Sequence, residues 1–228
     1  MSVIVLVHGA YQGGWIWGPT AAVLRAAGHT IYTPTIDGCA ERHHQIRAGI
    51  TTETQAAELA EWLRYEDLSD VVLVGTSSGG MVAASLAEQA RERIRRIVFA
   101  DALVLQDGEA LPDIVTRTNP VTTEFGTGPQ VEHVRDRLFA DLTDDVRDWA
   151  LERTTLHPIA TMTAPVRLAS FWASTWDAHV IWCKRSANPP VAHQRRAADA
   201  LGARWSELDC GHYPMLEVPE ALARLIAE

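Results

Sequence analysis

A G-x-S-x-G pattern between a strand-like run and a helix-like run constrains this sequence more than any other feature. Residues 71–74 are Val-Val-Leu-Val, which is typical of a buried strand. The pattern follows at once at residues 75–79, and residues 81–90 have the composition of a helix. Glycines allow backbones to crowd at a sharp turn. This order favours a strand–turn–helix with Ser77 exposed at its apex as a candidate nucleophile, over a plain Gly/Ser turn.

Strand-like and helix-like runs alternate along most of the chain. The further strand-like runs are residues 3–7, 30–33, 97–100, 179–183 and 204–208, and the helix-like runs are 15–27, 52–63, 190–201 and 219–226. This alternation predicts an α/β protein with a mostly parallel sheet and helices on both faces. Thr52 and Gln55 are expected to form a capping box at the start of the second helix.

Several polar or glycine-rich positions follow predicted strands directly. They are residues 8–11, Ser77 and Asp101. Because ligands of such sheets bind at the carboxyl ends of the strands, we expect these residues to converge on one site. A length of 228 residues suits one domain, 1–228, with a large core.

Residues 103–178 interrupt the alternation. Clusters of Pro, Gly and Thr are followed by helical patterns at 130–139 and 144–151 and by several tryptophans. We interpret this segment as a helical cap inserted over the site. Its aromatic residues either form an apolar pocket or fix the cap to the core. In the first case Trp172 and Trp176, together with Tyr11, would contact the substrate.

Composition excludes several classes of function. The net charge is −9 with no basic stripe, which argues against a nucleic acid or an anionic membrane surface as partner. The three cysteines are scattered, and no Cys or His group has zinc spacing, so we expect no disulfide framework, metal or cofactor. No signal peptide or membrane-length run is apparent, which predicts a cytoplasmic protein. The expected partner is a small-molecule substrate, and the sequence leaves a monomer and a homodimer equally open.

A serine nucleophile needs a base, and a histidine base needs a carboxylate to hold it. His212 is the best candidate base because it lies in the loop after the last predicted strand and completes a Ser…Asp…His order. The backbone N–H groups of Ser78 and Ala10 are the expected oxyanion-hole donors. His8 is expected to shape the loop that carries Ala10.

Three motifs, at residues 6–15, 75–80 and 211–216, together resemble the α/β-hydrolase superfamily. The most similar branch is that of plant methylesterases and hydroxynitrile lyases with their bacterial esterase relatives. The resemblance implies an α/β-hydrolase fold with Ser77 as nucleophile, His212 as base, and Ala10 and Ser78 as oxyanion donors. The leading hypothesis is a serine esterase that cleaves a small or medium hydrophobic carboxylic ester through an acyl-enzyme.

The sequence departs from that branch at the acid. There the acid follows the strand matching residues 180–183, but here Ser186 occupies the corresponding position. A serine cannot supply the charge that stabilises an imidazolium. Asp101 is the favoured replacement. Asp209, a dyad held by water or by Ser186, and impaired catalysis are the alternatives.

A second departure concerns the reaction. The hydroxynitrile lyases of the branch have Lys after the catalytic His and Thr where this chain has Gly9, whereas Tyr213 follows His212 here. This difference favours ester hydrolysis over cyanohydrin cleavage. The alternatives are a lactonase, lyase or cyclase of secondary metabolism, or a binding protein that has lost its chemistry.

Overall fold

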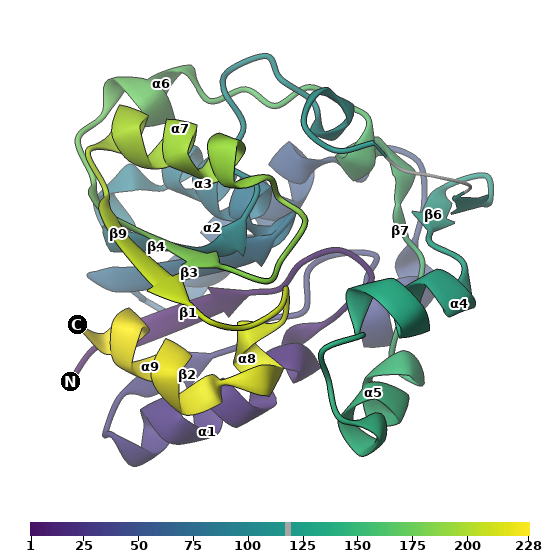
Figure 1. Ribbon diagram of the computed structural model, residues 1–228. Helices are drawn as coiled ribbons and strands as arrows, with labels where there is room; N and C mark the ends of the chain where they lie inside the picture. Colours follow the sequence, from purple (N-terminus) through teal and green to yellow (C-terminus); the bar gives the residue numbers. More distant parts are fainter. Residues whose placement is uncertain (117–119) are drawn as a thin grey trace.

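A six-stranded sheet is the centre of the computed structural model, which describes residues 1–116 and 120–228 (Figure 1). The strand order is β2-β1-β3-β4-β8-β9, and every neighbouring pair is parallel. The strands are β1 (Val3–Val7), β2 (Thr30–Tyr32), β3 (Val71–Ser77), β4 (Ile94–Ala102), β8 (Asp177–Cys183) and β9 (Arg204–Leu208). The predicted α/β architecture is confirmed.

Helices cover both faces of this sheet (Figure 1). One face packs against α1 (Gly18–Ala26), α8 (Pro214–Glu217) and α9 (Pro219–Ala227), and the other against α2 (Thr52–Tyr65), α3 (Gly79–Gln89) and α7 (Val191–Leu201). In β1, Ile4 and Leu6 pack on the face covered by α1, α8 and α9, and Val5 and Val7 pack on the face covered by α2, α3 and α7. Because successive side chains point to opposite faces, a strand buried on both faces is apolar throughout.

The start of α2 differs from the prediction. Its N-cap is Thr51, whose side chain accepts from the Thr54 backbone N–H while the Thr54 hydroxyl accepts from Thr51. The capping box predicted for Thr52 and Gln55 is therefore wrong by one residue. Gln55 is fully buried and its amide donates to the backbone oxygen of Asp37 (2.8 Å), so a tertiary contact takes the side chain expected at the cap.

We call the segment between β4 and β8, which the sequence predicts to be a cap, the cap segment or cap. It contains a small antiparallel sheet of β5 (Val121–Thr122), β6 (Gly126–Gly128) and β7 (His157–Pro158), and the helices α4 (Val131–His133), α5 (Asp144–Leu151) and α6 (Ala169–Ala173). In Figure 1, α4, α5 and the small sheet lie beyond one end of the main sheet, while α6 lies back beside it. The small sheet was not predicted, because strands of two or three residues show no periodicity.

Candidate active site

The nucleophile candidate is at the turn between β3 and α3. Ser77 ends β3 with a φ of 51°, and Ser78 is the N-cap residue of α3. A Cβ on Gly75 would come within 2.7 Å of the Gly79 carbonyl oxygen, and one on Gly79 within 2.4 Å of the His8 oxygen. Only glycine fits at either position, so both flanking glycines are required by the sharp turn that holds Ser77 at its apex.

The loop after β1 lies against this turn. A Cβ on Gly9 would come 2.7 Å from the Cβ of Ser77, and Ala10 lines the same pocket as Ser77 and Ser78. His8 shapes the loop, because its Nδ1–H donates to the Gly9 oxygen (2.8 Å) and its Nε2 accepts from a backbone N–H (3.1 Å). Burial lowers the pKa of His8 to about 4, so its ring stays neutral near pH 7.

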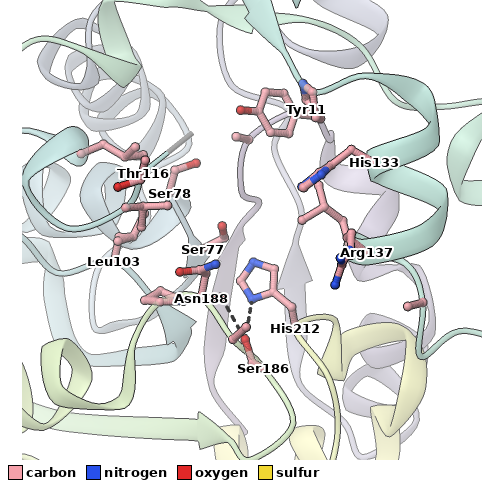
Figure 2. A pocket seen from close by; sticks show the side chains of 18 of the residues that line it. Tyr11, Ser77, Ser78, Leu103, Thr116, His133, Arg137, Ser186, Asn188 and His212 are labelled. Carbon is pink, nitrogen blue, oxygen red and sulfur yellow. Dashed lines mark hydrogen bonds between the residues drawn. The ribbon is translucent and has the colours of Figure 1, made fainter. Parts of the chain in front are cut away.

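The imidazole of His212 contacts two side chains from different strand ends. Its Nδ1–H donates to Asp101 Oδ2 (2.6 Å), and the same nitrogen lies 3.4 Å from Ser186 Oγ (Figure 2). Because the Ser186 hydroxyl itself donates to the Asn188 carbonyl oxygen (2.9 Å), its oxygen can face His212 only as an acceptor. The predicted carboxylate, Asp101, and the predicted base, His212, are therefore in direct contact, and Ser186 lies beside them.

Asp101 reaches His212 from a β-bulge. Thr76 is paired with Ala100 and Ser77 with Ala102, so Asp101 has no partner on β3. Its φ is 46° and the residue is fully buried. A bulge re-aims the side chain of the extra residue, and Asp tolerates the left-handed region better than most non-glycine residues. The backbone of β4 thus turns this carboxylate toward the loop after β9.

The alternative acid Asp209 lies elsewhere. Its side chain is largely exposed, and its carboxylate pairs with Arg185 (3.5 Å). Arg185 also pairs with Glu217. Asp209 therefore belongs to a surface ion-pair cluster, while the hydrogen bond to His212 comes from Asp101.

A pocket of about 670 Å³ opens above these residues. Ser77 and His212 lie between two walls in Figure 2, one with Ser78, Leu103 and Thr116 and the other with His133 and Arg137. Its other apolar lining residues include Leu111, Val115, Pro129, Leu138 and Met162. The cap supplies most of these side chains, so it shapes the space in which a substrate would lie.

Of the three predicted substrate contacts, the structure places only Tyr11 in this pocket. The indole of Trp172 donates to the Leu105 carbonyl oxygen (3.0 Å), and Trp176 stacks on Phe171 with 5.2 Å between ring centroids. Neither tryptophan is among the described residues that line the pocket. Trp172 lies on α6 and Trp176 directly before β8, where the chain returns to the main sheet, and both pack against the core. The structure therefore does not place these two predicted substrate contacts in the pocket.

Sequence reasoning missed two groups of residues around the site. His133 and Arg137 come from the cap, whose path no pattern in the chain reveals. Gln194 comes from α7, where its amide donates to Asp101 Oδ1 (2.8 Å). A single glutamine in a helical pattern is an ordinary surface residue by sequence, so no signal marks it.

Neither a metal centre nor a membrane span is found in the described part of the chain. No group of three or more His, Cys, Asp or Glu side chains among residues 1–116 and 120–228 could hold a metal ion. The helices described there include none that is long and apolar enough to cross a membrane.

Residues 4–225 match the profile of the Alpha/beta hydrolase family. The chain is 32% identical over 240 residues to a carbendazim hydrolyzing esterase of Nocardioides sp. (strain SG-4G), covering 100% of this chain and 99% of that protein. It is 33% identical over 101 residues to an alpha-hydroxynitrile lyase of Arabidopsis thaliana, covering 44% and 39% respectively. Among solved structures, an extracellular alpha/beta-hydrolase from a Paenibacillus species superposes with a TM-score of 0.86 at 22% identity, covering 100% of this chain and 98% of that one.

Proposed function

The chain belongs to the alpha/beta hydrolase family and is an ester hydrolase, and we propose that it cleaves a carboxylic ester through an acyl-enzyme formed on Ser77. The observation that carries the proposed mechanism is the 2.6 Å hydrogen bond between His212 Nδ1 and Asp101 Oδ2. Ser77 and His212 line the same pocket, and Asp101 is buried on the far side of the hydrogen bond to His212. A serine, a histidine and a buried carboxylate in this relation are the groups that serine esterases need.

His212 acts as the base. Because its Nδ1–H donates to Asp101, the proton-free nitrogen of the neutral ring is Nε2, which accepts the proton of the Ser77 hydroxyl as the oxygen attacks the ester carbon. The imidazolium that forms is stabilised by the negative charge of Asp101. Ser186, which occupies the position of the acid in the resembling branch, cannot provide this charge, so Asp101 acts as the acid in its place.

The developing oxyanion is stabilised by the backbone N–H groups of Ala10 and Ser78. Ser78 precedes α3, whose N-terminus also favours negative charge. The tetrahedral intermediate collapses as His212 gives its proton to the leaving alcohol, which leaves the acyl group on Ser77. His212 then activates a water molecule that hydrolyses the acyl-enzyme and restores the serine.

The proposed substrate is a small or medium hydrophobic ester. The pocket volume of about 670 Å³ is in the range of drug-sized ligands, and apolar side chains such as Leu103, Leu111 and Met162 line it. Carbendazim is one compound to test, because the esterase relative that matches the full chain is named for its hydrolysis.

The test is turnover of p-nitrophenyl acetate, p-nitrophenyl butyrate and carbendazim by the wild type and by Ser77→Ala. We expect the wild type to release p-nitrophenol with a burst and Ser77→Ala to lose turnover. Mass spectrometry of the quenched reaction should find the acyl group on the peptide that contains Ser77. Turnover without this adduct would contradict the acyl-enzyme. A wild type inactive on all esters would contradict the esterase and leave a lactonase, lyase, cyclase or binding protein to be tested.

A further inference from the structure

A buried glutamine holds the side of the Asp101 carboxylate that faces away from His212. Gln194 on α7 is 1% exposed, and its Nε2 donates to Asp101 Oδ1 (2.8 Å) and to the Pro189 carbonyl oxygen (3.1 Å). We propose that Gln194 is a positioning residue that fixes the Asp101 carboxylate against His212. This inference rests on the function proposed above, in which Asp101 is the acid.

The hydrogen bonds of Asp101 support this role. The residue has no solvent contact, so both carboxylate oxygens need donors from the protein. Oδ2 accepts from His212, while Oδ1 accepts from Gln194 at 2.8 Å and from the Cys183 backbone N–H at 3.5 Å. Of these two hydrogen bonds to Oδ1, the one from the Gln194 amide is the shorter. Donors on both oxygens fix the plane of the carboxylate, and with it the direction of the bond to His212.

The chemistry of an amide suits this position. An arginine or lysine at Oδ1 would place a positive charge beside the carboxylate and cancel part of its field at the imidazole. A glutamine satisfies the oxygen without changing the net charge. Among the ion pairs of the described residues, Asp101 is paired with His212 and with no arginine or lysine.

The same amide also holds the loop after β8. Its second bond goes to Pro189, which lines the pocket together with Ser186. Ser186 in turn lies 3.4 Å from His212 Nδ1. One side chain therefore fixes both strand ends that contact the imidazole, so its loss should disturb catalysis more than its distance from the substrate suggests.

The first test replaces the amide with an apolar side chain of similar length, Gln194→Met. Gln55→Met is the matched control, because Gln55 is also fully buried and its amide donates to a backbone oxygen (Asp37, 2.8 Å) on another part of the molecule. We expect Gln194→Met to lower kcat for p-nitrophenyl butyrate about 10- to 100-fold, with KM within about twofold. In the Asp101→Asn background Gln194→Met should have no further effect, whereas Gln55→Met should leave kcat unchanged in both.

The second test is the pH profile of Gln194→Glu, which keeps the shape of the side chain. A neutral carboxyl can donate one hydrogen bond to Asp101, as the amide does. Burial beside another carboxylate raises the pKa of the introduced carboxyl. Measured as a ratio to the wild type at the same pH, kcat of the variant should therefore be highest at the acid end of the profile and fall as the pH rises and the donor becomes an acceptor. The wild type and Gln55→Glu should show no such loss, and a Gln194→Glu profile identical to the wild type would contradict the inference.

A third measurement needs no turnover. The NMR resonance of the His212 Nδ1 proton reports its hydrogen bond to Asp101. We expect this resonance to shift or disappear in Gln194→Met and to persist in Gln55→Met. An inactive wild type would overturn the proposed esterase but would leave this comparison to decide the positioning role. If Gln194→Met does not fold, the resonance is measured instead in Gln194→Glu, at pH values below and above the one at which this variant loses kcat. A resonance and kcat unchanged in both Gln194 variants would overturn the inference.

Discussion

The ends of β4 and β8 both reach the imidazole of His212, but they offer it different groups. The end of β4 presents Asp101, a buried carboxylate 2.6 Å from Nδ1, and the end of β8 presents Ser186, a hydroxyl 3.4 Å from the same nitrogen. The strands are neighbours in the sheet, so either end can place a side chain there. Two neighbouring strand ends therefore reach the same nitrogen of His212, and only the β4 end carries a charge, which is why we propose that end as the source of the acid.

The largest expected effect follows from removing the charge at the β4 end. Asp101→Asn should lower kcat/KM for p-nitrophenyl butyrate by about 1,000-fold or more, because the imidazolium loses its counter-ion and the amide can hold the wrong tautomer. Asp209→Asn is the control, since that carboxylate is exposed and pairs with Arg185, and it should stay close to the wild type. Near-wild-type activity of Asp101→Asn would show that the β4 end does not supply the acid.

Moving the carboxylate to the β8 end should recover part of the loss. We expect Asp101→Ser combined with Ser186→Asp to be about 10-fold or more faster than Asp101→Ser alone, because Ser186 already lies next to His212 and an aspartate there restores a counter-ion. The same ester assay measures both variants. A double variant as slow as the single one would mean that the β8 end can no longer accept an acid.

A buried histidine that contacts the chain just beyond the end of β4 makes the stability of the folded protein depend on pH. His193 Nε2 accepts from the Val104 backbone N–H (3.0 Å), and burial together with Arg196 lowers the pKa of His193 to about 4. The unfolded chain therefore takes up this proton at a higher pH than the folded one. Stability that is complete above pH 6.5 is lost as the pH falls toward 4, by about 2 kcal/mol between pH 7 and 5.

Urea unfolding of the wild type and His193→Gln at these two pH values measures this contribution. The variant should be less pH-dependent, although His8 and His179, whose pKa values burial also lowers to about 4, keep part of the slope. The exposed residue His44 provides the control variant His44→Gln, which should match the wild-type slope. An unchanged slope in His193→Gln would contradict the assignment.

The smallest effect is expected at Ser186 itself. Ser186→Ala removes a neutral and long contact to His212, so kcat/KM should change by less than about threefold. A much larger loss would mean that the hydroxyl shares the work of orienting the ring, which would reduce the contrast between the two strand ends.

The sheet and the turn at Ser77 could be predicted from sequence because each depends on local signals. Apolar runs such as residues 71–74 mark strands buried on both faces, and Gly75 and Gly79 are needed where backbones approach closely. The contact between His212 and Asp101 was expected because Asp101 follows a predicted strand and Ser186 occupies the usual position of the acid. The bulge that turns Asp101 toward His212 has no local signature, because it arises from the pairing of two strands.

The cap and the support of the acid could not be predicted for the same physical reason. The aromatic pattern at Trp172 and Trp176 fits a pocket or a core equally well, and only the return of the chain beside α3 decides between them. Gln194 resembles any polar residue on a helix until α7 is placed against the end of β4. Such roles are set by tertiary contacts, which dominate where local preferences are weak.

The placement of Ser77 and Asp101 on adjacent strands, and of His212 on a loop, also bears on how the enzyme responds to heat. Ser77 and Asp101 are carried by adjacent strands joined by backbone hydrogen bonds, whereas His212 is carried by a loop. Local opening of a loop costs less free energy than separation of two central strands. Warming should therefore detach the histidine while the serine and the carboxylate keep their spacing, so activity fades reversibly before the sheet melts.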